Sequence, residues 1–467
     1  MREGKNKMKK IKPSLVKGTR DFLPEQVNKR RYILSTIQSV FKKFGFQEIE
    51  TPAMESLETL TGKYGEEGDK LLFKILNSGD FLTKVDDKSL QEKDSRGITF
   101  KISEKGLRYD LTVPLARYVV QHQNDLNFPF KRFHIGPVWR ADRPQKGRYR
   151  EFFQCDADII GSTSLLNETE LTLILAEAFE SLEISVKIQL NNRKILEGII
   201  ETVGVSNLYK EILIAIDKKD KIGEEGVEKE LQTLNLTSEQ ITDLFELFSI
   251  TDLDKLANAF EGKSVIGIEG TNEMKAIMAK CSHDNIVFSP ALARGLDYYT
   301  GTIWEVVAND VQMGTIAAGG RYDNLTEMFG GQNMSGVGIS FGVERIYDVL
   351  EELNKWPSDI TTSTKVLIIN FGHELQTRAS NKLQTRASSE SEGWKLLQEL
   401  RKNNIPSELF PDAAKLKKQM SYADKKNIPY VIFIGEEEIN SGKFSLKEMK
   451  SGEQQVLSLE AVVEVLK

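Results

Sequence analysis

Cysteine and histidine are scarce in this sequence. Only Cys155 and Cys281 occur among 467 residues, far apart and in no Cys-x-x-Cys pair. We therefore expect neither a disulfide framework nor a structural zinc site, and a reducing cytoplasm fits this usage. Histidine occurs at four scattered positions, 122, 134, 283 and 373, with no His-Glu-x-x-His spacing. The sequence therefore gives no support for a histidine-ligated metal.

Long apolar runs are also missing. No stretch approaches the roughly 20 apolar residues that a membrane-spanning helix needs. The Lys- and Arg-rich start is not followed by an apolar core, which argues against a secretory signal. We expect residues 1–13 to be a disordered basic tail, with Met1 or Met8 as the start of translation. The expected location is the cytoplasm.

Neither sign of charge dominates. Lys and Arg total 63 and Asp and Glu 69, for a net charge of −6, and 40% of the residues are hydrophobic. These values predict a globular chain with room for two or three domains. They exclude a histone-like RNA binder but leave local basic patches for RNA contact. The phosphate-binding pattern Gly-x-x-x-x-Gly-Lys-Ser/Thr is absent.

One segment, Val138–Asp158, concentrates polar chemistry. Five cations lie within a dozen residues, around a turn-like Pro-Gln-Lys-Gly: Arg140, Arg143, Lys146, Arg148 and Arg150. Side chains alternate across the strand pattern that follows. One face carries Arg148, Arg150, Phe152, Gln154, Asp156 and Asp158, and the other becomes apolar from Phe153 on. The polar face suits a polyphosphate, a flat base and an α-amino group, although a solvated charged hairpin is the alternative.

Further segments have a regular pattern. Residues 25–45 predict an amphipathic helix and 46–52 a short strand, which serve the core alone or a dimer interface as well. Residues 107–114 predict a strand with Arg108, Asp110 and Thr112 on one face, and the polar residues 77–105 predict a variable hairpin or loop. Near 336–350 a strand leads into a helix from Gly342. Arg345 falls in the first turn, either as a surface ion pair or held there for a phosphate.

The remaining chain divides by composition. Residues 191–285 lack proline and predict an inserted helical domain, 357–365 a linker, and 366–467 a compact α/β module with a mostly parallel sheet. The hexapeptide LQTRAS occurs twice between 375 and 388. We assign no function to this repeat or to the 77–105 loop.

A helix and strand ending in proline, an Arg-bearing hairpin and a Gly-rich strand leading into an Arg-bearing helix follow the order of motifs 1, 2 and 3 of class II aminoacyl-tRNA synthetases. Within that class, residues 14–467 closely resemble the histidyl-tRNA synthetase family. The resemblance is carried by KGTRDFLPE (17–25), RYDLTVPLAR (108–117), FHIGPVWRADRPQKGRYREFF (133–153), ARGLDYYTG (293–301) and AGGRYD (318–323).

The resemblance implies a fold of the α/β class with an α+β catalytic core. A six-stranded antiparallel sheet with flanking helices would occupy residues 14–190 and 286–356, the helical insertion 191–285, and an anticodon-binding domain 366–467. It also implies a homodimer. The expected activity is histidine–tRNA ligation: L-histidine and ATP give histidyl-adenylate and pyrophosphate, and histidine then passes to the 3′ end of tRNA(His). Mg²⁺ is expected to bridge the β- and γ-phosphates.

Residue roles follow from the matching positions. The ATP-binding set is Arg140 at the α-phosphate, Arg148 and Arg345 at the β/γ end, and Phe152 on adenine. The resemblance assigns the α-amino group of histidine to Asp110, Thr112 and Gln154, and the imidazole to Asp158 and Tyr299. Tyr298 and Tyr322 line the same pocket. Arg140 and Arg294 are the expected catalytic residues, both also touching histidine, with Arg294 beside the α-phosphate.

Two departures and two rival interpretations remain. The chain has Arg-Tyr-Asp-Leu-Thr where other members have Arg-Pro-Glu-Gly-Thr, and Asp158 where those have Glu. The rivals are a non-catalytic histidine-sensing paralogue, the regulatory subunit of ATP phosphoribosyltransferase, and a class II synthetase for another amino acid. The retained arginines and the C-terminal hundred residues argue against the first, and RGLDYY with Asp158 and Tyr299 argues against the second.

Overall fold

The computed structural model describes residues 12–62, 65–293, 299–324, 326–331, 333–357, 360, 364–371 and 382–467. The chain folds into two compact units. The first reaches Asp21 and resumes from Arg30 to Lys355, and the second comprises Phe22–Lys29 and Trp356–Lys467.

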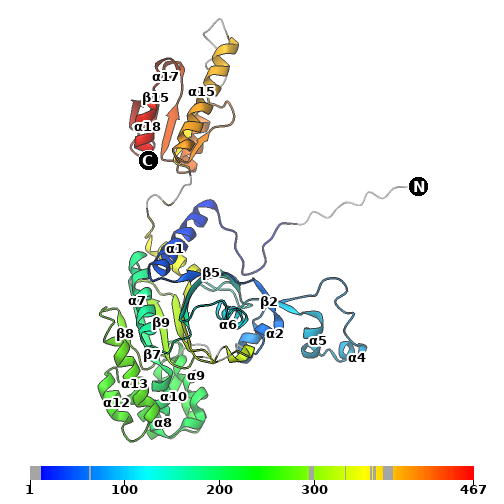
Figure 1. Ribbon diagram of the computed structural model, residues 1–467, viewed down its shortest axis with the longest axis vertical. Coiled ribbons are helices and arrows are strands. Elements are labelled where there is room, and N and C mark those ends of the chain that lie inside the picture. Colours follow the sequence, from blue (N-terminus) through cyan, green and yellow to red (C-terminus); the bar gives the residue numbers. More distant parts are fainter. Residues whose placement is uncertain are drawn as a thin grey trace, which may run out of the picture. The chain divides into compact units, whose positions relative to one another are not determined.

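An eight-stranded sheet organises the first unit (Figure 1). Its strands, in spatial order, are β1 (Gln47–Glu48), β5 (Phe130–Trp139), β6 (Glu151–Ile160), β11 (Gly336–Gly342), β10 (Ala317–Tyr322), β9 (Thr302–Ala308), β7 (Val186–Asn192) and β8 (Ile286–Phe288). The six strands from β5 to β7 pair antiparallel. This confirms the expected antiparallel sheet, to which β1 and β8 add parallel edges.

Three helices cover the apolar face of this sheet: α1 (Pro24–Lys43), α7 (Leu166–Ser181) and α14 (Val343–Leu353). Phe41 of α1 lies 5.5 Å from the Phe133 ring and 5.8 Å from the Phe341 ring, and Phe179 of α7 lies 5.5 Å from Phe341. The predicted helix at 25–45 is therefore confirmed, with its apolar stripe buried. Gly45, at φ +79°, follows its end, where a left-handed residue favours glycine.

The opposite face is polar and carries α6 (Thr112–Gln121), which Figure 1 shows within the curve of the sheet. The predicted strand at 107–114 is wrong beyond β4 (Lys105–Leu107), because the chain turns and α6 begins. The Asp110 carboxylate accepts a hydrogen bond from the Val113 N–H at 3.0 Å, which starts the helix. Leu115, Ala116 and Val119 of α6 then pack against the ends of β5, β6 and β10.

The expected loop at 77–105 is also partly helical. It contains α4 (Asp87–Glu92) and α5 (Ser95–Ile102), whose first turns are capped by the carboxylates of Asp86 and Asp94. Beside them lie a small sheet of β2 (Met54–Ser56), β4 and β3 (Lys74–Ile75), and the helices α2 (Leu57–Leu60) and α3 (Gly65–Lys70). Figure 1 shows α4 and α5 standing away from the large sheet.

Helices fill the proline-free stretch, as its pattern predicts. They are α8 (Arg193–Val203), the 3-10 turn Ser206–Leu208, α9 (Tyr209–Asp217), α10 (Lys219–Thr233), α11 (Ser238–Ser249), α12 (Leu253–Phe260) and α13 (Val265–Met278). The Asn192 side chain accepts from the Lys194 N–H at 2.9 Å and so begins α8 at the end of β7. Figure 1 shows these helices gathered at the β7–β8 end of the sheet.

The second unit has a five-stranded sheet in the order β13 (Ser407–Leu409), β12 (Val366–Ile368), β14 (Tyr430–Phe433), β15 (Phe444–Glu448) and β16 (Gln454–Leu457). Its helices are α15 (Lys382–Lys402), α16 (Leu416–Lys425), α17 (Glu436–Ser441) and α18 (Leu459–Leu466). The expected parallel order holds for β13, β12 and β14, whereas β15 and β16 pair antiparallel. The first LQTRAS copy lies outside the described residues, and the second falls in α15.

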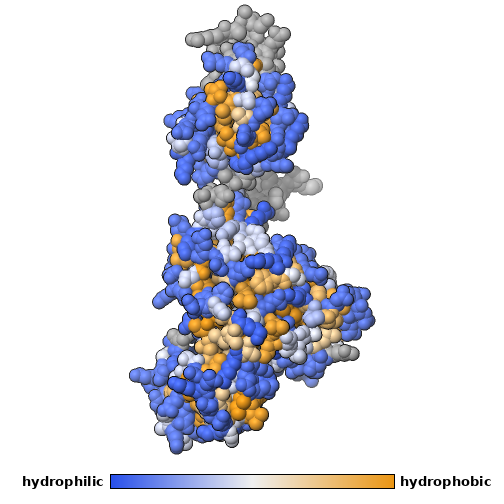
Figure 2. Space-filling view, turned by 60° about the vertical axis from the view of Figure 1, so that its left-hand side comes forward, coloured by the Kyte–Doolittle hydropathy of each residue, from blue (hydrophilic) through white to orange (hydrophobic). Residues whose placement is uncertain are grey.

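The face of the molecule shown in Figure 2 is mainly hydrophilic, with smaller apolar patches between the polar areas. Among the helices that the structure describes, none is long and apolar enough to cross a membrane. Cys155 and Cys281 are both free and buried.

Candidate active site

The polar face of the sheet is assembled by the register of three strands. Arg132, His134 and Gly136 on β5 lie directly opposite Asp158, Asp156 and Gln154 on β6. On β11, Gly338 and Ser340 lie opposite Asp158 and Asp156. Directly opposed residues project to the same face of a sheet. The predicted alternation of β6 is confirmed in this respect, because its even-numbered side chains form a common surface from Gln154 on.

Asp158 lies between Arg132 of β5 and Gly338 of β11 and is 2% exposed. The Tyr322 hydroxyl donates to its Oδ1 at 2.5 Å, and Arg132 Nη2 lies 2.6 Å from its Oδ2. Burial raises the pKa of Asp158, while Arg132 and the Tyr322 hydrogen bond oppose that rise. Two residues predicted for one pocket, Asp158 and Tyr322, are thus in direct contact.

Gln154 is oriented by a neighbouring strand. Its Nε2 donates to Ser340 Oγ at 2.7 Å, and its buried Oε1 has no hydrogen-bond partner in the described part of the chain. Asp156 Oδ1 and the Nε and Nη1 of Arg132 are likewise buried without a partner among these residues. Buried polar atoms are normally satisfied, so this surface suits a ligand with both donors and acceptors. An ammonium group could donate to the Gln154 carbonyl oxygen.

Asp110 lies at the start of α6, 3% exposed, and Thr112 is the first residue of that helix. A carboxylate is favoured at a helix N-terminus, where backbone N–H groups and the helix dipole stabilise negative charge. Arg108 fixes the preceding turn by donating to the backbone oxygens of Pro137 at 2.9 Å and Thr51 at 2.7 Å. The approach is close at Gly136, because a Cβ there would lie 2.5 Å from Arg108 Nη2.

Arg140 follows β5 and lies between two aromatic rings. Its guanidinium is 4.3 Å from the Tyr109 ring centre and 5.2 Å from that of Phe152, and its Nε donates to Tyr109 O at 3.1 Å. Phe152 is half-buried rather than part of the core. The predicted cation and ring therefore share one place, with the cation held over aromatic faces.

Arg345 links α14 to the loop between β5 and β6. Its Nε donates to Gly147 O at 2.8 Å, and its Nη1 donates to Thr315 O. Arg148, next to Gly147, has a side chain that is 48% exposed and lies 3.6 Å from Asp142. The structure brings these two predicted arginines to the same loop. Arg345 occupies the first turn of α14, as predicted.

Tyr299 packs against the apolar cluster that contains Tyr322. Gly320 makes room for it, because a Cβ at that position would lie 2.5 Å from the Tyr299 ring. Two further predicted residues, Arg294 and Tyr298, lie outside the described residues.

The site therefore lies on one face of an antiparallel sheet. Its polar floor consists of Arg132, His134, Gln154, Asp156 and Asp158, and further arginines and aromatic rings flank it. Sequence comparison gives the family that uses this arrangement. The pattern of the histidyl-tRNA synthetase family matches residues 18–346, and that of an anticodon-binding domain matches residues 365–467.

The chain belongs to the histidyl-tRNA synthetase family.

Relatives in this family match over the full length. The chain is 51% identical to the histidine–tRNA ligase of Christiangramia forsetii, covering 98% of this chain and 99% of that protein. It is 50% identical to the histidine–tRNA ligase of Bacteroides fragilis, over 97% and 99%. The solved histidyl-tRNA synthetase of a Nostoc species is 29% identical and superimposes with a TM-score of 0.80 over 98% and 99%. These relatives are aminoacyl-tRNA ligases, and they support aminoacylation over the regulatory alternative.

Asp156 and His134 are both buried, and the sequence alone assigned neither of them a role. Burial raises the pKa of Asp156 to about 7, with Arg132 opposing and Asp158 reinforcing the rise. Burial, together with Arg132 and Arg108, lowers the pKa of His134 to about 3, so its imidazole is neutral. The alternation of β6 already placed Asp156 on the polar face, whereas Arg132 and His134 could be found only from the register of β5.

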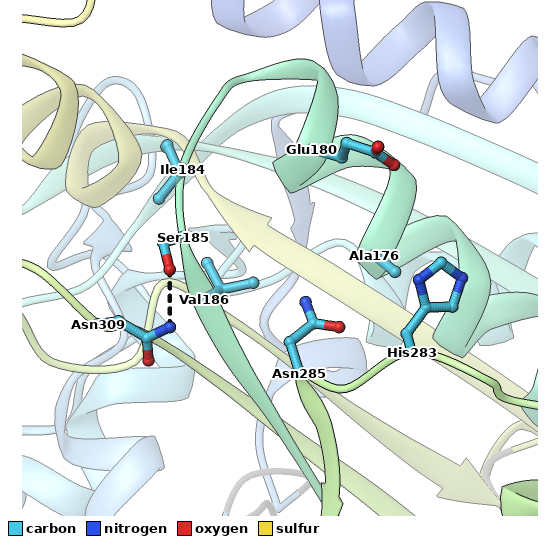
Figure 3. Close-up of a pocket in the computed structure, with 8 residues that line it drawn as sticks. All are labelled: Ala176, Glu180, Ile184, Ser185, Val186, His283, Asn285 and Asn309. Atoms are coloured by element: carbon cyan, nitrogen blue, oxygen red, sulfur yellow. Dashed lines mark hydrogen bonds between the residues drawn. The ribbon is translucent and has the colours of Figure 1, made fainter.

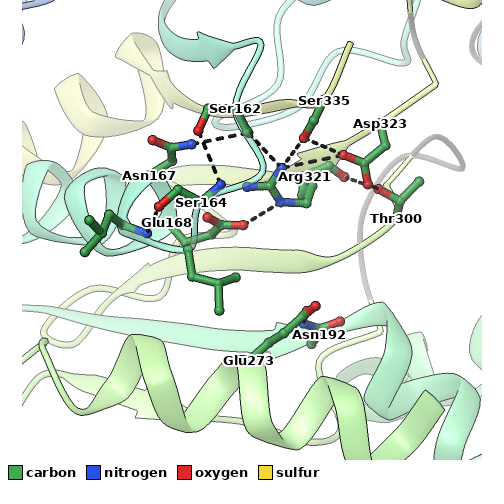
Figure 4. A network of polar contacts seen from close by, with 12 residues as sticks. Ser162, Ser164, Asn167, Glu168, Asn192, Glu273, Thr300, Arg321, Asp323 and Ser335 are labelled. Atoms are coloured by element: carbon green, nitrogen blue, oxygen red, sulfur yellow. Dashed lines mark hydrogen bonds and ion pairs between the residues drawn. The ribbon is translucent and has the colours of Figure 1, made fainter. Parts of the chain in front are cut away.

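A second polar network surrounds Arg321 of the AGGRYD segment (Figure 4). Its Nε donates to Glu168 Oε1 of α7 at 2.5 Å, in an ion pair whose carboxylate is fully buried. Its Nη1 donates to Ser335 Oγ and lies 3.5 Å from Asp323, which also accepts from Thr300 Oγ1 at 2.5 Å. The network therefore joins residues adjacent to Tyr322 and Tyr299 and fixes the backbone of both.

A pocket of about 270 Å³ lies elsewhere, between α7 and the β7–β8 edge (Figure 3). Its lining residues are Ala176, Glu180, Ile184, Ser185, Val186, His283, Asn285 and Asn309. No predicted site residue lines it, and the Asn309 side chain there donates to Ser185 Oγ at 2.9 Å. This pocket is therefore separate from the polar floor described above.

Proposed function

We propose that this chain activates L-histidine with ATP and transfers it to the 3′ end of tRNA(His). The observation that carries the proposal is the polar floor, in which Asp158 is fixed by Tyr322 and Arg132 and the Gln154 carbonyl oxygen is left to accept. The full-length agreement with histidine–tRNA ligases supports it.

Histidine binds with its ammonium group at Asp110, Thr112 and the Gln154 carbonyl oxygen, which together accept its three donors. The imidazole meets Asp158 and Tyr299, beside Tyr322 and Tyr298. Fixed polar partners at both ring nitrogens reject analogues that lack those atoms.

ATP lies with adenine on Phe152, its α-phosphate at Arg140 and Arg294, and its β/γ end at Arg148 and Arg345. A carboxylate oxygen of histidine attacks the α-phosphorus, the bond to the bridging oxygen breaks, and pyrophosphate leaves. The arginines stabilise the negative charge that develops on the phosphoryl oxygens. In the second step a hydroxyl of the terminal tRNA adenosine attacks the histidyl carbonyl carbon, and AMP leaves.

Mg²⁺ arrives with ATP as part of the substrate. Within the described ranges no group of three or more His, Cys, Asp or Glu side chains could hold a metal ion. Mg²⁺ bound with a nucleotide usually keeps several waters and is held largely by phosphate oxygens.

The domain assignment belongs to the same proposal. Residues 14–190 and 286–356 form the catalytic domain, 191–285 the inserted helical domain and 366–467 the anticodon-binding domain. The family patterns at 18–346 and 365–467 support this division. The protein is a cytoplasmic homodimer, for which light scattering should give twice the chain mass of 52.8 kDa.

Charging of a tRNA(His) transcript with labelled histidine tests the proposal. Wild type should charge it, and Asp158→Asn should raise the KM for histidine strongly, because the carboxylate acceptor for the imidazole is lost. Asp125→Asn is the matched control, since that carboxylate is 80% exposed. Histidine binding without charging would support the regulatory alternative and contradict the proposal.

A further inference from the structure

Arg132 occupies an unusual position for a cation. Its side chain is fully buried on β5, directly opposite Asp158 of β6. Nη2 lies 2.6 Å from Asp158 Oδ2 and donates to Leu111 O at 3.4 Å. Leu111 separates Asp110 from Thr112 in the sequence. One guanidinium therefore contacts both the carboxylate assigned to the imidazole and the backbone between two residues assigned to the ammonium group.

The Asp158 carboxylate is enclosed by its neighbours. Arg132 lies at one oxygen and the Tyr322 hydroxyl at the other, and a Cβ added to Gly338 would lie 2.0 Å from Oδ1. A glutamate here would need space for one more methylene, in an interior where an extra methylene forces neighbours to shift. Arg132 lies directly opposite on β5, with Nη2 2.6 Å from the carboxylate, so a longer side chain at position 158 would have to displace it.

Arg132 also supplies the charge that a buried carboxylate needs. Removing one partner of a buried ion pair leaves an uncompensated charge, which is strongly unfavourable. An ionised carboxylate accepts a hydrogen bond more strongly than a neutral one. The buried cation therefore opposes the rise in pKa that burial imposes on Asp158, and so favours the form that best accepts the imidazole N–H.

On the basis of the proposed function, we propose that Arg132 is a positioning residue for histidine recognition, which pairs with the Asp158 carboxylate and fixes its position relative to the ligand. Because the aspartate side chain is short, its contact with Arg132 on the neighbouring strand determines how far the carboxylate extends towards the ligand. Its hydrogen bond to Leu111 O also fixes the backbone between Asp110 and Thr112 relative to Asp158.

A double-mutant cycle with Arg132→Met and Asp158→Glu tests this pairing. Each single change should raise the KM for histidine by about tenfold or more, consistent with loss of a charge-assisted contact. The KM for ATP should stay within about threefold of wild type. The double variant has room for the longer carboxylate but still lacks the cation, so its increase in the KM for histidine should be at least about tenfold smaller than the product of the two single increases.

Two further variants separate positioning from general damage. Arg132→Lys keeps the cation and should recover part of the affinity for histidine. Lys131→Met removes the neighbouring cation, which pairs with Glu170 at 2.5 Å, and should leave both KM values unchanged. Circular dichroism checks the fold, and if Arg132→Met does not fold, Arg132→Lys and the double variant still carry the comparison.

Three results would overturn the inference in a wild-type enzyme that charges tRNA with histidine. These are an unchanged histidine KM in Arg132→Met, single effects that simply multiply in the double variant, or an equal rise in the KM for ATP. Wild-type protein that does not activate histidine would instead contradict the proposed function, so the two failures are distinguishable.

Discussion

Asp156 and His134 face each other across β6 and β5, and their opposite pKa shifts should cancel in the pH dependence of stability. The pKa of Asp156 rises from 3.8 to about 7, chiefly by burial, with Arg132 lowering it and Asp158 and Asp110 raising it. The pKa of His134 falls from 6.5 to about 3, through burial, Arg132 and Arg108. Between about pH 4 and 6.5 the folded pair holds its proton on Asp156, and the unfolded pair holds it on the histidine.

The sign differs for the two groups. Asp156 contributes stability that is present below pH 3.8 and lost as the pH rises towards 7, because the folded state binds the extra proton. His134 contributes stability that is present above pH 6.5 and lost as the pH falls towards 3. Each proton changes the free energy of unfolding by about 1.4 kcal/mol per pH unit. Over pH 4 to 6.5 each group therefore accounts for about 3 kcal/mol, in opposite directions.

Asp156→Asn and His134→Asn separate these contributions. Relative to wild type, Asp156→Asn should gain stability by about 1.4 kcal/mol per unit as the pH rises from 4 to 6.5. His134→Asn should lose stability at the same rate relative to wild type. Urea unfolding of all three proteins at pH 4.5, 5.5 and 6.5 measures both differences. Parallel pH profiles for the three proteins would show that Asp156 and His134 do not make these opposite contributions to stability.

Three further predictions concern separate parts of the molecule. Arg321→Met should lower the free energy of unfolding by about 3–5 kcal/mol, because it leaves the buried Glu168 unpaired. Adding Glu168→Leu should restore much of the lost stability in the same urea assay. Phe152→Ala should raise the KM for ATP by roughly 5- to 100-fold through loss of stacking and leave the KM for histidine nearly unchanged. Steady-state exchange kinetics measure both KM values, and equal effects on the two would contradict the place of Phe152 at adenine. Removal of residues 366–467 should reduce tRNA charging far more than adenylate formation, and equal loss in both assays would indicate a structural role for that segment.

The sequence was sufficient where one local pattern had one meaning. The alternation in β6 places Gln154, Asp156 and Asp158 on one face because strand side chains alternate. The glycine before α14 and the apolar spacing after it likewise place Arg345 in a first helical turn.

The start of α6 and the place of Arg132 depend on tertiary contacts. Residues 107–114 alternate like a strand, but the Asp110 carboxylate caps the Val113 N–H, and Pro114 is tolerated in the first turn of a helix. Arg132 belongs to no motif in the sequence, and only the pairing of β5 with β6 reveals its place opposite Asp158. Such a register is a long-range property, which a single segment does not encode.

The proposed function requires that the polar floor selects histidine for activation by ATP. ATP–pyrophosphate exchange, measured on the purified protein with Mg²⁺ and each of the twenty amino acids in turn, tests it most directly. Exchange is expected with histidine, and only background with the other amino acids. Stronger exchange with another amino acid, or histidine binding without exchange, would contradict it.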